Sequence, residues 1–464
     1  MRLTTATVTT LAGYALQAGL LALAFGIARA SGAWAFALTT TNMQLLLAGG
    51  AALVLGSLVV LVVARGRAGA GRSAGFTLPL TVALVTGALC FLLAEVGIRV
   101  LARPDPLGAR LGNTVLLPYD WPALAAMNRE LLARSEGPDA FYVPDPALGW
   151  RIAPGRATRD GLAVSSAEGL RSATRGEILA QEAPGSPVAL LGNSFAFSEE
   201  VTWQDSLAPK LQSSLGPSFR VLNFGVPGYG LDQAALRFRS LEAHWKPAVA
   251  LLTFIEDDLN RVVNVYPFLK VDWGLPVSKP RYVLADDRLQ LLNVPNLGGD
   301  ELFGQASIFD LPLLDQDIEF AAERWHRSPF HASWVIRLLH GLTPLWPPAG
   351  EPVSPPVIAR LGVLILADFV AAARERGAVP VIAYFPTRGD FQDAGARELK
   401  RRTLAEAAAA GIAVADLTPC LGDRLEPGAL FVAGGHYTDA GNAAVAACLD
   451  PLVRAAAADR TSSP

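Results

Sequence analysis

The chain has 464 residues, of which 51% are hydrophobic and 17% are charged, and its formal net charge is −3. This slightly acidic balance, with no basic run beyond a short arginine-rich loop, excludes the usual signature of a nucleic-acid-binding protein. The length allows about two or three domains, and the apolar excess lies mainly in the first hundred residues, where we expect a membrane segment.

Three apolar stretches open the chain, near residues 7–28, 43–65 and 76–100. Each is long enough, or nearly so, to cross about 30 Å of hydrocarbon as a helix. A cleaved signal peptide fits less well, because no charged, apolar and small-residue cleavage pattern precedes the second and third stretches. We therefore predict three transmembrane helices and assign residues 1–102 to a membrane anchor.

Arginines flank these predicted helices in equal numbers on the two sides of the membrane. Arg99 lies four residues after Glu95, so the two side chains can pair on a helix and offset each other's charge. The loop that holds Arg65, Arg67 and Arg72 then favours the cytoplasmic side. We predict that the N-terminus is inside and that the C-terminal domain is extracytoplasmic.

Residues 103–150 are expected to form a linker with one surface helix, 122–135. Residues 151–464 alternate short apolar strands with amphipathic helices, which predicts an α/β domain with a parallel five-stranded sheet covered on both faces. The predicted strands are 187–191, 220–224, 249–254, 380–384 and 412–415. The predicted helices are 203–214, 231–243, 357–377, 393–410 and 438–456.

A segment rich in proline and tryptophan, 261–356, interrupts this alternation between the third and fourth strands. Within it, residues 281–292 have the pattern of a hairpin that turns at Asp286-Asp287. An insertion of this length usually has a function or a substructure of its own, so we expect a lid or a partner-facing surface.

The three cysteines constrain the protein only weakly. Cys420 and Cys448 could form a disulfide if the domain faces an oxidising compartment, whereas Cys90 lies in the third apolar stretch. The sequence contains no CxxC, HExxH or EF-hand pattern, so we expect no metal. It also lacks a GxGxxG segment, so we expect no dinucleotide cofactor.

Three segments offer the parts of an acyl-transfer site. The strand 187–191 ends at Gly192-Asn193-Ser194, the next strand leads to Gly228, and His436 stands in a glycine-rich loop before the last helix. In an open α/β sheet these segments return to the same edge, where ligands bind. Ser194 would supply a nucleophile, and His436 would supply a base. The glycine turn would supply backbone hydrogen-bond donors. An ordinary helix N-cap remains the alternative for Ser194. The other histidines have no catalytic context; they are His244, His326, His331 and His340.

Over about residues 145–456, these blocks resemble the SGNH/GDSL hydrolase superfamily. The resemblance rests on Gly192-Asn193-Ser194, on the segments 223–228 and 256–258, and on the His436 loop. It implies a flavodoxin-like three-layer α/β/α domain with ester or acyl-transfer chemistry. It also implies Ser194 as nucleophile, His436 as base, and the amides of Ser194 and Gly228 as the oxyanion hole.

The sequence departs from this family after the third strand. The family places an asparagine there as a further oxyanion donor, whereas this chain has Asp257, followed by Asp258. An ionised carboxylate would repel the oxyanion, so Asp257 could serve only if it were protonated, or else turned away and paired with Arg261. Asn260 could substitute, but it lies one helical turn further on.

A second departure concerns the carboxylate that orients the histidine. The family has an aspartate two or three residues before the histidine, and these positions are here Gly434 and Ala433. Asp439 and Asp416 are the remaining candidates. Without either one, a Ser–His dyad with a poorly fixed tautomer would be slow.

These features support two hypotheses. The first is a membrane-anchored serine esterase or O-acyltransferase that acts on an acylated carbohydrate or lipid of the cell envelope, through a Ser194 acyl-enzyme. The second is a non-catalytic SGNH-like module that binds glycan or organises envelope assembly, and it is favoured by the two departures.

Overall fold

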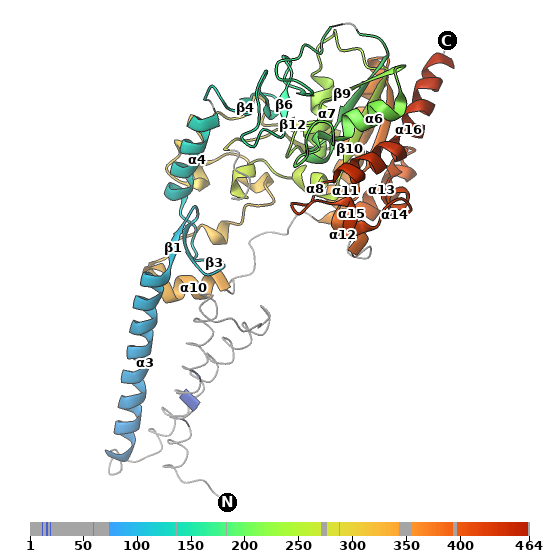
Figure 1. Cartoon of the computed structure of the whole chain (residues 1–464). Helices are drawn as coiled ribbons and strands as arrows, with labels where there is room; N and C mark the ends of the chain where they lie inside the picture. The colour runs from blue at the N-terminus through green and yellow to red at the C-terminus, as the bar shows by residue number, and fades with distance from the viewer. Residues whose placement is uncertain are drawn as a thin grey trace, which may run out of the picture. The chain divides into compact units, whose positions relative to one another are not determined.

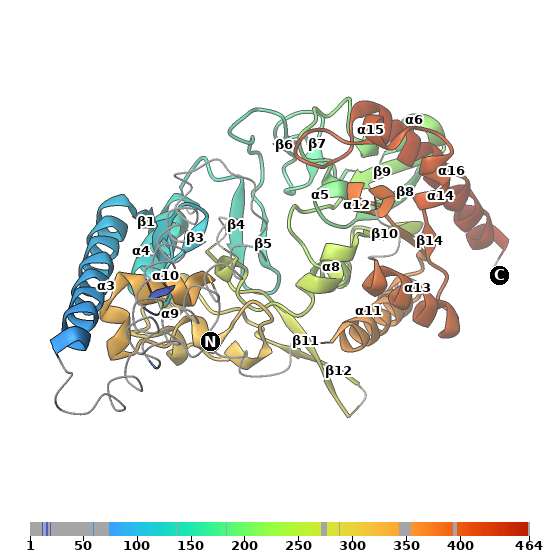
Figure 2. The same cartoon turned by 90° about the horizontal axis from the view of Figure 1, so that it is seen from below.

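The computed structural model (Figures 1 and 2) describes a few isolated positions before residue 74 and most of residues 74–464. The exceptions within that range are 136, 182, 271–275, 287, 343–353, 393–396 and 463–464. The predicted spans 7–28 and 43–65 lie outside the described residues. Two compact units can be separated. The first takes the described residues up to 127 and those of 321–350, and the second takes 128–320 and the rest of the chain. The predicted boundaries at 102 and 150 stay predictions.

The first unit begins with α3 (Ala74–Leu101), an unbroken helix of 28 residues that coincides with the third predicted span. At 1.5 Å per residue it is about 42 Å long, which exceeds the hydrocarbon thickness of a bilayer. Many of its large apolar side chains are exposed, among them Leu84, Leu89, Phe91, Leu92, Leu93 and Val96. Whether α3 crosses a membrane stays a prediction.

The end of α3 is joined to α10 (Trp334–Leu342) through one carboxylate. The predicted pair of Glu95 with Arg99 is confirmed, with an oxygen–nitrogen distance of 2.7 Å. Glu95 also accepts a hydrogen bond of 2.9 Å from the amide of Trp334. A carboxylate in this position satisfies amides that the first turn of a helix leaves unpaired. The unit also contains β1 (Arg103–Asp105), β2 (Gly108–Leu111), β3 (Thr114–Val115), η5 (Ala322–Arg324) and η6 (Pro329–Ala332).

The second unit is built on a sheet with the order β14-β13-β10-β8-β9-β7-β6. Its strands are β6 (Val164–Ser165), β7 (Arg171–Ser172), β8 (Ser186–Leu191), β9 (Phe219–Asn223), β10 (Val249–Phe254), β13 (Val379–Tyr384) and β14 (Ala415–Asp416). The five predicted strands all form and run parallel, in the flavodoxin-like order 2-1-3-4-5. The predicted strand number was wrong, because β7 and β6 extend the sheet antiparallel at one edge. With two residues each, they are too short for an alternating pattern to indicate them.

Helices cover both faces of this sheet (Figure 2). Alternate side chains of β8 separate the two cores, because successive residues of a strand point to opposite faces. Ala189 and Leu191 pack with the helices α7 (Leu231–Arg239), α11 (Pro355–Glu375) and α13 (Glu398–Ala409). Val188 and Leu190 pack with α6 (Leu207–Leu215) and α16 (Asp439–Ser462). This arrangement is an α/β/α sandwich.

In the second unit, α11 has the length and hydropathy to cross a membrane. In its most apolar stretch, 56% of the residues are buried within the unit. Leu361, Leu366 and Phe369 lie in the core against the sheet. This burial matches the amphipathic core helix that the sequence predicts for 357–377.

The insertion forms the predicted hairpin from β11 (Arg281–Ala285) and β12 (Arg288–Leu292), with Ala285 paired to Arg288. The strand pairing therefore ends at Ala285 and Arg288, on either side of the position where the sequence predicts the turn. The remaining elements of the second unit are short. They are β4 (Tyr142–Asp145), β5 (Gly149–Ile152), α5 (Ser194–Phe197), α8 (Glu256–Arg261), η1 (Pro267–Leu269), α9 (Gly299–Phe303), η3 (Ile308–Asp310), η4 (Leu314–Gln316), α12 (Arg388–Gln392), α14 (Thr418–Gly422) and α15 (Pro427–Leu430). The predicted helix 122–135 forms as α4 (Trp121–Ser135).

A disulfide joins Cys420 of α14 to Cys448 of α16. The two cysteines are 28 residues apart in the sequence, and the loop that the bond closes contains His436. Disulfides of this kind persist in oxidising compartments and are rare in the cytosol.

Candidate active site

A tight turn presents Ser194 at the end of β8. Gly192 packs so closely on the neighbouring strand that a Cβ atom there would lie 2.4 Å from the Oγ1 atom of Thr253. Asn193 is the N-cap of α5, because its side-chain oxygen accepts a hydrogen bond of 2.8 Å from the amide of Phe195. The capping role therefore belongs to Asn193, which leaves the Ser194 hydroxyl available for other contacts.

The other end of the Asn193 side chain fixes this turn to α8, the short helix that follows β10. Its amide nitrogen donates to both carboxylate oxygens of Asp258, at 2.8 and 2.6 Å. Asp258 also accepts from the Ile255 amide at 3.0 Å and from Arg261 at 2.6 Å. Burial raises the pKa of Asp258 to about 6, against the opposing effects of Arg261 and Asn193. This buried network links the carboxyl ends of two central strands, where ligands bind in this topology.

His436 completes a three-residue chain of hydrogen bonds. Its Nε2 atom lies 2.8 Å from the Oγ atom of Ser194, and its Nδ1 atom lies 2.5 Å from a carboxylate oxygen of Glu200. Because an ionised carboxylate only accepts hydrogen bonds, Nδ1 holds the ring proton and donates it. The lone pair of Nε2 then faces the serine hydroxyl, which is the tautomer that a general base requires.

Within the part of the chain that the structure describes, neither of the predicted orienting aspartates forms a hydrogen bond or ion pair with His436. Asp439 instead forms an ion pair with Lys210. Asp416 lies 3.2 Å from Lys400 and also accepts hydrogen bonds from Thr418. The assignment of the orienting role to Asp439 or Asp416 is therefore corrected, since the carboxylate at Nδ1 comes from a residue that the sequence did not indicate.

Gly434 explains how Glu200 reaches the ring. A Cβ atom on Gly434 would lie 1.8 Å from the Oε1 atom of Glu200, so the glutamate carboxylate fills the space of a side chain at this position. Residue 434 is one of the two positions where the family pattern has an aspartate. The carboxylate that contacts His436 thus comes from the segment after α5 and not from the histidine loop. The glycine was the one sequence signal that could have prompted a search for another acid.

The segment that presents Glu200 has an unusual backbone. Ser198 and Glu200 have φ values of 61° and 71°, in the left-handed region that residues other than glycine rarely adopt. Arg171, which is buried, donates hydrogen bonds to the carbonyl oxygens of Phe197 at 2.5 Å, of Ser198, and of Val201 at 2.6 Å. Burial lowers the pKa of Arg171 to about 10, so it remains a cation at neutral pH. Arg171 therefore holds this strained segment in place.

A second carboxylate lies on the serine side of the ring. Glu199 is 3.7 Å from Nε2 of His436, which is longer than a hydrogen bond. Burial raises the pKa of Glu199, while the nearby His436 opposes that shift. Glu199 is therefore a neighbour of the site with no orienting contact to the ring.

The turn that contains Gly228 is fixed from both sides. Trp150 donates from its indole nitrogen to the Pro227 carbonyl at 3.0 Å, and the Tyr229 hydroxyl donates to the Trp150 carbonyl at 2.6 Å. Gly228 itself has a φ of +84°, which favours glycine. Ser194 is the first residue of α5, so its amide is one that the helix leaves unpaired. Both backbone segments assigned to an oxyanion hole are thus rigidly supported.

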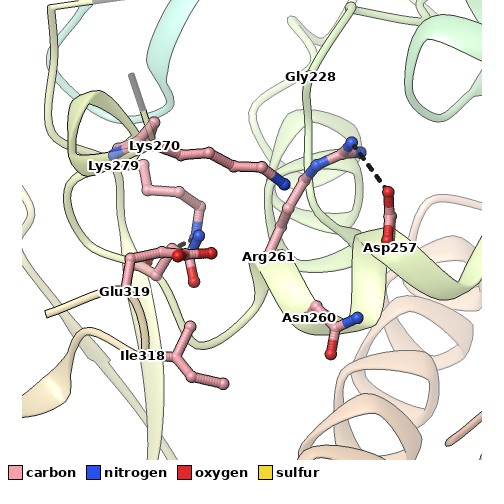
Figure 3. Close-up of a pocket in the computed structure, with 10 residues that line it drawn as sticks. Gly228, Asp257, Asn260, Arg261, Lys270, Lys279, Ile318 and Glu319 are labelled. Atoms are coloured by element: carbon pink, nitrogen blue, oxygen red, sulfur yellow. Dashed lines mark hydrogen bonds and ion pairs between the residues drawn. The ribbon is translucent and has the colours of Figure 1, made fainter. Parts of the chain in front are cut away.

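Asp257 turns toward Arg261, as Figure 3 shows. The distance between their charged atoms is 3.9 Å, and 64% of the Asp257 side chain is exposed. The pairing with Arg261 that the sequence suggested for Asp257 is confirmed. Asn260, the possible substitute donor, lines the same cavity as Gly228 and Asp257.

Comparisons with known proteins add little beyond a distant likeness. No model of a known protein family matches the sequence, and no curated protein matches it. One solved structure that resembles the chain belongs to a G-D-S-L-family protein of Desulfitobacterium hafniense DCB-2, named as a candidate lipolytic protein. The two share 12% identity with a TM-score of 0.30, and the match covers 59% of this chain and 99% of the other. At these values the likeness decides nothing about this site, whose interpretation rests on its geometry.

The role of Arg171 can be measured through stability. Arg171→Met would leave three carbonyl groups without their charged donor, and we expect the free energy of unfolding to fall by about 3 kcal/mol or more. Arg175→Met, which removes an exposed arginine with one bond to Gly155, should cost less than about 1 kcal/mol. Urea unfolding followed by tryptophan fluorescence compares the two. Equal losses would contradict the assigned role.

Proposed function

We propose that this protein is a membrane-anchored serine esterase or O-acyltransferase of the SGNH type, acting on acylated carbohydrate or lipid of the cell envelope. The observation that supports the chemistry is the continuous hydrogen-bonded chain from Ser194 through His436 to Glu200. A non-catalytic module has no need for a nucleophile, a base with a fixed tautomer and an orienting carboxylate in this geometry.

The reaction begins with attack on the ester carbonyl by Ser194. As the Oγ–carbon bond forms, the hydroxyl proton passes to Nε2 of His436, and Glu200 stabilises the resulting imidazolium. The carbonyl oxygen becomes an oxyanion, which the amides of Ser194 and Gly228 stabilise. His436 then returns the proton to the departing alcohol, and an acyl-enzyme remains on Ser194.

The second half repeats these steps with a new acceptor. His436 removes a proton from water or from a sugar hydroxyl, whose oxygen attacks the acyl carbon and forms the new bond. The Ser194 oxygen departs and recovers its proton from His436. Asp257 does not block this sequence, because its charge is partly offset by Arg261 and its side chain is mostly exposed.

A fluorophosphonate probe tests the nucleophile. The full-length protein in detergent should be labelled on Ser194, since this class of reagent reacts with activated serines, and Ser194→Ala should abolish both labelling and hydrolysis of p-nitrophenyl acetate. Mass spectrometry of the labelled peptide locates the adduct. A wild-type protein that neither labels nor turns over ester would favour the glycan-binding or envelope-assembly alternative.

The two adjacent glutamates provide a matched pair for testing the orienting role. Glu200→Gln should lower kcat by about 1,000- to 10,000-fold, because the amide no longer fixes the productive tautomer. Glu199→Gln removes a charge that makes no hydrogen bond to the ring, and should lower kcat by less than about fivefold. Steady-state hydrolysis of p-nitrophenyl acetate separates the two. The reverse order would transfer the orienting role to Glu199.

The membrane orientation can be tested by reporter fusion. We propose that the domain is extracytoplasmic, a view supported by the Cys420–Cys448 disulfide and by the exposed apolar side chains of α3. Alkaline phosphatase fused after residue 464 should be active, because it folds only where its own disulfides form. An inactive phosphatase fusion together with an active cytoplasmic reporter would place the domain inside.

A further inference from the structure

A cavity of about 240 Å³ lies beside the Gly228 turn (Figure 3). Its volume corresponds to about eight water molecules. Its lining includes Gly228, a proposed oxyanion donor, and also Asp257 and Asn264; Ile318 and Glu319 lie on the side away from Asp257. All of these residues belong to the second unit.

The cavity is connected to the nucleophile turn through two hydrogen-bonded contacts. Arg261, which lines it, donates to Asp258 at 2.6 Å. Asp258 in turn accepts from Asn193, the residue before Ser194. A group bound in the cavity would therefore lie against the same rigid network that fixes the proposed nucleophile.

Asn264, one of the residues that line this cavity, has a buried and unsatisfied polar atom. The residue is 8% exposed, and its side-chain oxygen is buried without a hydrogen-bond partner among the described residues. Buried acceptors in folded proteins nearly always have a donor. Because Asn264 lines the cavity, rotation of its amide group would bring this oxygen within reach of a hydroxyl group of a bound ligand, which can supply that donor.

The charges around the cavity do not favour an anionic ligand. Lys279 is paired with the buried Asp232 at 2.6 Å, and Arg261 is paired with Asp258. The remaining cation, Lys270, shares the lining with two carboxylates, those of Glu319 and of Asp257, the second of which also pairs with Arg261. A phosphate headgroup would meet no net positive charge here. Hydroxyl groups, which both donate and accept, match this mixture of amides, carboxylates and an ammonium group.

An apolar surface completes the lining. Ile318 and Pro267 contribute side chains without polar atoms to a cavity that is otherwise polar. A pyranose ring has both kinds of surface, since its hydroxyl groups project around the ring while its C–H groups form an apolar face. A simple acyl chain would leave the polar groups of this cavity unpaired, at a cost in binding free energy.

We propose that this cavity is the subsite for a sugar ring of the substrate, next to the acyl-transfer centre. The inference rests on the proposed function and names its substrate class as a glycan. Most of the subsite comes from the first part of the insertion, which supplies Arg261, Asn264, Lys270, Ile318 and Glu319. The insertion thereby acts as a specificity element of the domain.

A glycan array tests binding separately from chemistry. The full-length Ser194→Ala protein in detergent should retain at least one glycan of the array. Adding Asn264→Leu, which keeps the side-chain size but removes its hydrogen-bonding groups, should weaken that binding by about tenfold. Glu319→Gln in the same background should weaken it by about fivefold. Glu375→Gln, a matched change of an exposed glutamate at the end of α11, should leave binding unchanged.

The outcomes separate this inference from the proposed function. Retention of no glycan, or equal retention by the pocket variants and the Glu375 variant, overturns the sugar subsite. Thermal unfolding checks each variant, and Glu319→Gln decides the question if Asn264→Leu does not fold, because Glu319 is exposed. Glycan binding lost in the pocket variants, with no ester turnover by the wild-type protein, would instead contradict the proposed reaction and leave the subsite standing.

Discussion

The contact between Glu200 and His436 is the interaction on which the proposed chemistry depends. A serine and a histidine in hydrogen-bond contact have little reactivity unless the ring keeps its proton on the far nitrogen. Here the carboxylate of Glu200 lies 2.5 Å from that nitrogen, and it fits only because residue 434 has no side chain. The glycine at position 434 and the glutamate at position 200 therefore belong to one arrangement, because the first makes room for the second.

This arrangement places demands on the surrounding backbone. Glu200 can reach the ring only if the chain turns sharply after α5, and it does so with left-handed residues at 198 and 200. Such conformations persist when neighbouring contacts compensate for their cost. The buried guanidinium of Arg171 supplies those contacts, while the Asn193–Asp258 network fixes the nucleophile on the other side. The site is thus positioned by polar groups from three separate segments.

Much of the fold was predictable from the sequence, because buried parallel strands and amphipathic helices leave regular apolar patterns. Four of the five predicted strands, the hairpin of the insertion and the long core helix form near their expected bounds, whereas the fifth strand, predicted at 412–415, is the two-residue Ala415–Asp416. The two edge strands were missed because two residues cannot show a period. Ser194 was predicted because it follows a strand in a tight glycine turn. His436 was predicted because it precedes a helix in a glycine-rich loop.

The orienting acid could not be predicted in the same way. Asp439 is close to His436 in the sequence, whereas the acid that contacts the ring is 236 residues away and is brought near by the fold. Asp416, the other candidate, lies in the sheet. Each of the two aspartates instead forms an ion pair with a lysine. The role of Gly434 becomes clear only when the structure shows that the Glu200 carboxylate fills the space of the absent side chain.

Moving the carboxylate back to the histidine loop tests this account most directly. Rates of p-nitrophenyl acetate hydrolysis should be compared for Glu200→Gly, which suits the left-handed backbone there, and for the double variant Glu200→Gly with Gly434→Asp. The account predicts a slow single variant and a double variant at least about tenfold faster, since a carboxylate again reaches the ring. A Glu200→Gly protein as fast as the wild type, or a double variant no faster than the single one, would contradict it.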